Sequence, residues 1–165
     1  MSGHAALAVR LLELCRARGV MIATAESCTG GGVIASLTDI AGSSDVVDRG
    51  FVTYSNDAKM DMLGVMRETL DRFGAVSQQT ALEMAAGALR RSRAGLALSV
   101  TGIAGPGGGS PQKPVGLVWF GVALQGVPIV AEKRLFADEG RAFVRRQAVV
   151  TALQLGVEAL TPAKP

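Results

Sequence analysis

The chain has little of several residue types on which common enzyme sites depend. Its 165 residues include one histidine, two cysteines and only 4% aromatic residues. The single His4 excludes a histidine-based triad or zinc site, and two cysteines do not make a disulfide framework. No apolar run reaches the ~18 residues of a membrane span, and no segment resembles a signal peptide. We therefore expect a cytoplasmic protein without metal, cofactor or membrane partner.

The charge of the chain is mildly basic, with a net charge of +3 and a pI of about 9.2. Only Arg90, Arg91 and Arg93 cluster tightly, and a helix C-terminus accounts for such a cluster. The remaining basic residues are scattered, and few aromatic rings are present to stack on bases. This pattern argues against a nucleic-acid partner and suits an anionic small molecule.

The composition predicts one well-buried domain. Hydrophobic residues make up 48%, charged residues 19%, and the mean hydropathy is +0.32. A chain of this length buries roughly 70% of its unfolded surface and needs no covalent staples. We therefore expect a single domain over residues 1–165, with its core at about 5–160.

Hydrophobic periodicity gives the element order α-β-α-β-α-α-α-β-β-β-α. The expected helices span residues 4–18, 32–40, 56–65, 65–74, 77–93 and 139–160. The expected strands span residues 20–25, 46–55 and 94–102, followed by a hairpin of 115–124 and 127–136. This order predicts a layered α/β domain with a mixed sheet and helices on both faces.

Segments that carry hydroxyls or glycines follow three of the expected strands. They are TAESCTGGG at 24–32, the run Tyr54-Ser55-Asn56, and the stretch from Thr101 to Pro114. In open α/β sheets, ligands bind at the carboxyl ends of strands, against helix N-termini. These three segments are therefore the candidates for a functional site.

Ser27 lies where a buried strand turns into a helix, and it is either a helix cap or a nucleophile. The segment is not G-x-S-x-G and no catalytic histidine exists, which excludes an α/β-hydrolase. A serine without histidine needs another base, and a desolvated lysine can serve. Lys59 follows Tyr54 by five residues. A solvated helix face is the alternative for Lys59, and a partly buried strand end is the alternative for Tyr54.

The glycine- and proline-rich segment 103–114 is either a ligand loop or a long surface loop. Glycines let backbone amides approach an anion closely, and Lys113 adds positive charge. The segment has no G-K-[ST], and no G-x-G-x-x-G follows the first strand, so ATP and NAD are not expected.

Taken together, five segments resemble the CinA C-terminal domain family. They are TAESCTGG at 24–31, YSNDAK at 54–59, GAVS at 74–77, TGIAGPGGG at 101–109 and KPVG at 113–116. The resemblance extends from about Leu7 to Leu160. The chain is similar to the stand-alone form of the family, which lacks the additional N-terminal domain of the larger relatives. It implies a three-layer α/β/α sandwich and a homodimer or higher homo-oligomer.

The resemblance also implies an amidohydrolase that converts nicotinamide mononucleotide to nicotinic acid mononucleotide and ammonia. Its motifs map catalytic roles onto Ser27, Tyr54 and Lys59. Ser27 would attack the carboxamide carbon while Lys59, with Tyr54, takes the serine proton. Amides near Thr29 to Gly31 would form an oxyanion hole. The residues expected to contact substrate are Thr29, Gly30, Gly31, Thr101, Gly102, Gly105, Gly107, Gly108, Lys113, Arg141 and Arg145.

Several alternatives stay open at this point. Arg141 and Arg145 lie four apart on one helix face, which fits phosphate or ribose contacts and equally a solvated face. A non-catalytic nucleotide-binding or accessory domain would keep the glycine-rich segment without needing Lys59. A cysteine hydrolase would use Cys28, but it lacks a base partner too, and a core-facing side chain explains that residue.

Overall fold

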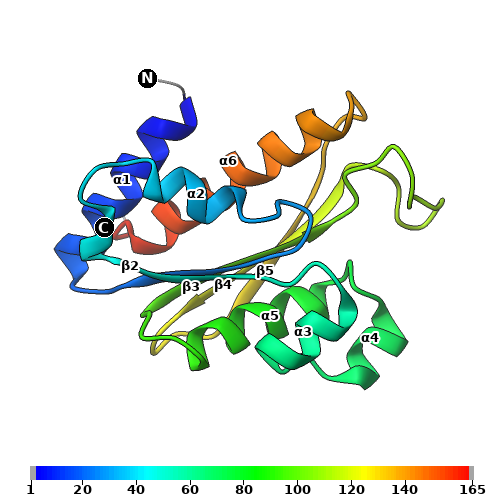
Figure 1. Ribbon diagram of the computed structural model, residues 1–165, viewed down its shortest axis with the longest axis horizontal. Helices are drawn as coiled ribbons and strands as arrows, with labels where there is room; N and C mark the ends of the chain where they lie inside the picture. The colour runs from blue at the N-terminus through cyan, green and yellow to red at the C-terminus, as the bar shows by residue number, and fades with distance from the viewer. Residues whose placement is uncertain (1–2, 164–165) are drawn as a thin grey trace.

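A mixed sheet separates two layers of helices in this computed structural model, which describes residues 3–163 (Figure 1). Residues 1–2 and 164–165, at the ends of the expected domain, lie outside the described residues. The helices are α1 (Gly3–Arg18), α2 (Gly32–Thr38), α3 (Asn56–Leu63), α4 (Arg67–Phe73), α5 (Gln78–Arg90) and α6 (Arg141–Leu160), with a 3-10 turn, η1 (Ser43–Asp45). The strands are β1 (Ile22–Glu26), β2 (Val47–Val52), β3 (Leu96–Gly102), β4 (Leu117–Leu124) and β5 (Val130–Leu135).

The sheet has the strand order β2-β1-β3-β4-β5. Strand β1 pairs in parallel with both β2 and β3, whereas β4 and β5 are antiparallel to their neighbours. The carboxyl ends of β1, β2 and β3 therefore lie at one end of the sheet. Figure 1 shows the start of α6 and the segment between β3 and β4 at that same end. The expected α/β class and mixed sheet are confirmed.

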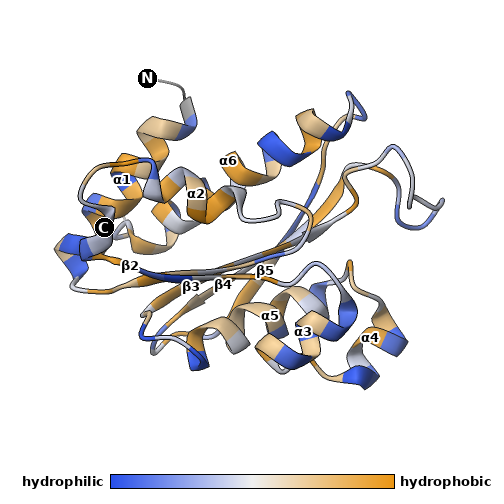
Figure 2. Ribbon diagram, viewed as in Figure 1, coloured by the Kyte–Doolittle hydropathy of each residue, from blue (hydrophilic) through white to orange (hydrophobic). Residues whose placement is uncertain are grey.

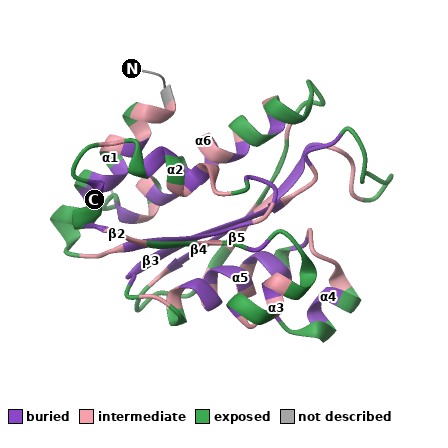
Figure 3. Ribbon diagram, viewed as in Figure 1, coloured by how far each residue is buried: buried purple, intermediate pink, exposed green. Residues whose placement is uncertain are grey.

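Each face of the sheet has its own hydrophobic core. Helices α1, α2 and α6 cover one face, where Leu11, Phe120 and Leu153 are fully buried. Helices α3, α4 and α5 cover the other, where Met84 and Leu63 are buried. Figure 2 shows apolar positions on the helix sides that meet the sheet, and Figure 3 shows the matching burial. No helix within residues 3–163 is long and apolar enough to cross a membrane.

Close backbone approach in the second core requires a glycine at one helix crossing. A Cβ atom built on Gly87 of α5 would lie 2.0 Å from the carbonyl oxygen of Leu63 in α3. Helix α3 can therefore pack tightly on α5 only because that position has no side chain. Because Lys59 lies on α3, this packing also fixes the position of that lysine.

The strand predicted over 46–55 is shorter in the structure, where β2 spans Val47–Val52. Its partner β1 ends at Glu26, which pairs with Val52, so no further ladder partner exists. The amide of Thr53 makes a last bond to the Glu26 carbonyl, and the chain then turns into α3. The helix predicted over 139–160 begins at Arg141, because Gly140 is the N-cap.

Candidate active site

Ser27 lies in the turn that leads from β1 into α2. Its amide donates to the carbonyl of Val100 in β3 at 2.9 Å, which extends the sheet by one bond. Gly30 and Gly31 follow with φ angles of 59° and 98°, so the chain reverses direction in a conformation that glycine favours. Ser27 is only partly buried. The turn thus holds the Ser27 hydroxyl at the carboxyl end of β1, open to one side.

Glu26 lies directly behind this turn and is fully buried. Its Oε1 accepts from the Thr29 hydroxyl at 2.7 Å and from the amide of Val33 at 2.8 Å. Its Oε2 accepts from the Thr24 hydroxyl and from the amide of Ile34, both at 3.0 Å. The two amides belong to the first turn of α2, where free N–H groups favour an acid. Glu26 therefore ties both ends of the Ser27 turn to one carboxylate.

Lys59 reaches Ser27 from helix α3. Ser55 caps this helix by accepting from the amide of Ala58 at 3.0 Å. The Lys59 side chain is buried, with 1% of the residue exposed. Its Nζ lies 3.1 Å from Ser27 Oγ and donates to the carbonyl of Thr53 at 2.9 Å. The structure thus brings the predicted nucleophile and base into hydrogen-bond distance.

Burial decides the protonation chemistry of Lys59. Loss of solvent lowers the pKa of the Lys59 amine below its ordinary value, while neighbouring Cys28 acts in the opposite direction. Burial also raises the pKa of the Cys28 thiol to about 11, so that thiol is neutral near pH 7 and its opposing effect is absent there. The amine is therefore held toward its neutral, proton-accepting form.

Cys28 has the properties of a core residue. It is 6% exposed, and a thiol with a pKa of about 11 supplies almost no thiolate at neutral pH. The lysine amine lies against the Ser27 oxygen instead. The arrangement therefore favours Ser27 over Cys28 as nucleophile.

Tyr54 and Arg141 form a pair at the opening above Ser27. Tyr54 is 61% exposed, and its hydroxyl accepts from Arg141 Nη2 at 2.8 Å. Arg141 Nη1 donates to the carbonyl of Gly105 at 2.8 Å. A single guanidinium therefore connects the end of β2, the start of α6 and the glycine-rich segment. Two of its five N–H donors are used in these bonds, which leaves three for a ligand.

A cleft of about 240 Å³, here called the Ser27 cleft, opens between these groups. The predicted site residues that line it are Ser27, Tyr54, Gly102, Gly105, Gly107, Gly108 and Arg141. Lys59 lies beneath it, against Ser27. The carboxyl ends of the three parallel strands thus meet at one concave site.

Two predicted basic contacts lie elsewhere. The amine of Lys113 donates to the carbonyl of Phe73 at the end of α4 and lines a separate pocket. The guanidinium of Arg145 donates to the carbonyls of Cys28 and Thr29, at 3.0 Å and 3.2 Å. Arg145 therefore braces the back of the Ser27 turn, while its helical neighbour Arg141 faces the cleft.

Four other predicted contacts, Thr101, Thr29, Gly30 and Gly31, are engaged within the fold. The hydroxyl of Thr101 donates to the carbonyl of Ala75 at 2.7 Å, and Thr101 is buried. The hydroxyl of Thr29 faces Glu26, as described above, and the amide of Gly30 donates to the carbonyl of Ser27 at 3.0 Å. The described residues that line the Ser27 cleft do not include Thr29, Gly30 or Gly31. Their place is in the turn that positions Ser27.

Glu26 and Thr53 are the residues that sequence reasoning missed. An acid placed one residue before the turn, with helix amides to follow, is a recognisable signal for Glu26. Thr53 acts through its backbone carbonyl, which no side-chain pattern reveals. Among residues 3–163, no group of three or more His, Cys, Asp or Glu side chains is arranged to hold a metal ion.

Known proteins resemble this chain over most of its length. The sequence profile of the CinA C-terminal domain matches residues 4–160. The nicotinamide-nucleotide amidohydrolase PncC of Escherichia coli strain K12 is 53% identical over 142 residues, 86% of each chain. A CinA-like protein of Kosmotoga olearia is 44% identical over 160 residues, which are 97% of this chain and 38% of that protein.

Solved structures show the same fold. The competence/damage inducible protein CihA from Agrobacterium tumefaciens has a TM-score of 0.93 and 54% identity, covering 97% of this chain and 96% of that chain. A CinA superfamily protein from Klebsiella pneumoniae has a TM-score of 0.91 and 36% identity, covering 96% and 98%. The chain therefore belongs to the CinA C-terminal domain family, as its motifs predicted.

Proposed function

We propose that this protein is an amidohydrolase that converts nicotinamide mononucleotide and water to nicotinic acid mononucleotide and ammonia. The observation that carries the proposal is the Ser27 hydroxyl 3.1 Å from a fully buried lysine amine with a lowered pKa. The 53% identical PncC of Escherichia coli bears the name of this activity. A non-catalytic nucleotide-binding domain would need no such serine–lysine pair.

In the acylation step, neutral Lys59 accepts the Ser27 proton as Ser27 Oγ attacks the carboxamide carbon. The neutral Lys59 amine retains two N–H groups. The Thr53 carbonyl accepts a hydrogen bond from one of them and thereby orients the amine. The C–N bond then breaks, and Lys59 returns the proton to the leaving nitrogen, which departs as ammonia. Water attacks the acyl-serine with Lys59 again as base, giving the carboxylate and free Ser27.

The developing oxyanion needs donors on the open side of the turn. The amide of Gly30 is used within the turn and Thr29 does not line the cleft, so we assign this role to the amide of Cys28. Glu26 accepts a hydrogen bond from the Thr29 hydroxyl, and Arg145 donates to the carbonyls of Cys28 and Thr29. These bonds hold the backbone of the turn in place. A preorganised turn of this kind stabilises charge in the transition state without reorganising.

We assign the 5′-phosphate to the part of the Ser27 cleft beside Arg141 and the glycine-rich segment. Arg141 offers its remaining donors there, and Gly107 and Gly108 leave the backbone accessible. Tyr54 forms one wall, and the bond from Arg141 fixes its hydroxyl. We therefore assign Tyr54 to substrate orientation.

The direct test is release of ammonia from nicotinamide mononucleotide by the purified protein, with Ser27→Ala and Cys28→Ala as a matched neighbouring pair. We expect Ser27→Ala to lose deamidation while keeping the circular dichroism spectrum, and Cys28→Ala to keep most of the activity. An active Ser27→Ala with an inactive Cys28→Ala would reverse the assignment. No ammonia from the wild-type protein would refute the proposed activity.

We further propose that the protein works in the cytoplasm as a homodimer or higher homo-oligomer. Both cysteines are free, which suits a reducing compartment. Met62 near the end of α3 and Met66 at the N-cap of α4 are 39% and 57% exposed, and such apolar surface suits contact with another subunit. Light scattering at several protein concentrations tests the assembly, and a monomer at all of them would refute it.

A further inference from the structure

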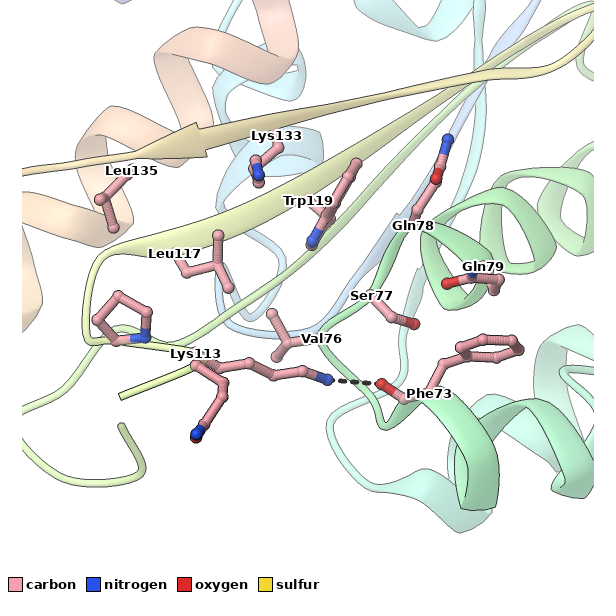
Figure 4. A pocket seen from close by; sticks show the side chains of 12 residues that line it. Phe73, Val76, Ser77, Gln78, Gln79, Lys113, Leu117, Trp119, Lys133 and Leu135 are labelled. Atoms are coloured by element: carbon pink, nitrogen blue, oxygen red, sulfur yellow. Dashed lines mark hydrogen bonds between the residues drawn. The ribbon is translucent and has the colours of Figure 1, made fainter. Parts of the chain in front are cut away.

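A second pocket lies on the α5 side of the sheet, outside the Ser27 cleft. Its volume is about 490 Å³, within the range of small-molecule sites. One wall is formed by β4 and β5, where Leu117 pairs with Leu135 and Trp119 pairs with Lys133. Figure 4 shows Trp119 and Lys133 on this wall, with Ser77 and Phe73 across from them. We call it the indole pocket, after Trp119.

The indole pocket is positively charged. Lys113 and Lys133 line it, and none of its described lining residues is an aspartate or glutamate. Lys113 reaches in from the glycine-rich segment and donates one proton to the Phe73 carbonyl, which leaves two for a ligand (Figure 4). Helix α5 also begins at the pocket, after its N-cap Ser77, and its dipole favours an anion there. The electrostatics therefore select an anionic ligand.

The pocket also offers an aromatic surface. Trp119 is only partly buried, and the ammonium of Lys133 lies 5.8 Å from its ring centroid. Leu135, on the same wall, is 66% exposed, although it is a large apolar side chain. A base that stacks on this ring face displaces the Lys133 ammonium, which can then pair with the negative group of the ligand.

We propose that the indole pocket binds an aromatic mononucleotide, with its base stacked on Trp119 and its phosphate between Lys133 and Lys113. The Ser27 cleft does not include these residues. The site therefore accommodates a second nucleotide, separate from the proposed substrate.

Two connections link the indole pocket to the Ser27 cleft. The segment between β3 and β4 contributes Lys113 to the pocket and Gly105 to the cleft. The Thr101 hydroxyl also holds Ala75, just before the pocket residues of α5, against the end of β3. A nucleotide that engages Lys113 thus contacts the same segment that lines the Ser27 cleft.

Trp119 is the only tryptophan in the chain, so its fluorescence reports on the pocket directly. The experiment titrates AMP into the full-length Ser27→Ala protein and follows tryptophan emission, with calorimetry as a second measure. Adenosine and inorganic phosphate, which offer only the ring or only the anion, serve as ligand controls. We expect saturable quenching by AMP and much weaker responses to either control.

Lys133→Gln and Arg134→Gln form the matched pair of variants. Each removes one positive charge from β5, but Arg134 pairs with Val118 and lies on the opposite face of the sheet. We expect Lys133→Gln to weaken AMP binding about tenfold, because it removes a charge-assisted bond. Arg134→Gln should bind AMP as the parent does.

Arg141→Gln separates the indole pocket from the Ser27 cleft. If AMP quenching is lost in Arg141→Gln and kept in Lys133→Gln, the ligand occupies the cleft and the proposal is wrong. The absence of a saturable response to AMP also refutes the proposal. So does quenching that increases with protein concentration in the absence of AMP, because a second copy of the chain would then cover the pocket. The readout is binding, so its failure leaves the proposed deamidase activity untouched, and the reverse also holds.

Discussion

Replacing Glu26 by glutamine tests whether one buried carboxylate holds the turn that carries Ser27. The two Glu26 oxygens each accept one backbone amide, from Val33 and from Ile34. A glutamine has one oxygen and one NH₂ group, so only one amide can keep an acceptor. The Thr24 and Thr29 hydroxyls can rotate to accept instead of donate, but an amide cannot.

The expected cost follows from this count. A buried donor left without a partner costs about 1–3 kcal/mol, and the remaining amide loses a charge-assisted bond worth about 1 kcal/mol more than a neutral one. Part of this loss is offset because a neutral side chain is easier to bury. We expect Glu26→Gln to lower the free energy of unfolding by about 2–3 kcal/mol.

Glu83→Gln is the matched control. Glu83 also accepts at the start of a helix, from the amide of Met66 at 2.9 Å and from the Thr69 hydroxyl. With one amide and one rotatable hydroxyl, a glutamine there satisfies both partners. We expect this variant to cost less than about 1 kcal/mol.

Urea unfolding followed by circular dichroism measures both variants. With m values of about 1–3 kcal/mol per molar, Glu26→Gln should move the midpoint down by roughly 0.7–3 M at unchanged m. Equal midpoints for Glu26→Gln and Glu83→Gln would refute the argument that two converging amides require a carboxylate.

The remaining predictions concern the base, the phosphate contact and the core. Lys59→Arg and Lys59→Met should both lower kcat by roughly 10²–10⁴, because neither supplies a neutral amine; near wild-type turnover in the arginine variant would exclude the base role. Because burial lowers the pKa of Lys59, the wild-type kcat/KM should rise with pH as that amine loses its proton, and a rate independent of pH on the acid side would contradict this. Arg141→Gln should reduce kcat/KM for nicotinamide mononucleotide much more than for nicotinamide riboside, which lacks the phosphate, whereas equal losses would speak against a phosphate contact. Gly87→Ala should destabilise the fold by at least about 1–3 kcal/mol in a thermal melt, since its Cβ would meet the Leu63 carbonyl, and an unchanged melting temperature would mean that this crossing relaxes freely.

The order of helices and strands was predictable from the sequence, because it depends on local periodicity and turn chemistry. The short apolar run before Glu26 and the 3–4 spacing in the first helix do not depend on distant residues. Strand ends were less predictable. Strand β2 stops at Val52 because its partner stops, and this is a property of the pairing.

The motifs also placed Ser27, Tyr54 and the glycine-rich segment at strand ends, since parallel strands bring their carboxyl ends to one side of a sheet. The role of each cation was not readable in this way. Lys113 and Arg145 carry the charge that a phosphate contact needs, but Lys113 binds the Phe73 carbonyl at the end of α4 and Arg145 binds carbonyls of the Ser27 turn.

Only the tertiary structure decided the state of Lys59. Sequence alone allowed an exposed lysine on a short helix or a desolvated base, because the helix pattern is the same for both. The packing of α3 on α5 buries the side chain and brings its amine to a serine 32 positions away. Removal from water then lowers the pKa of the amine, and such desolvation results from packing between distant segments, which no local pattern encodes.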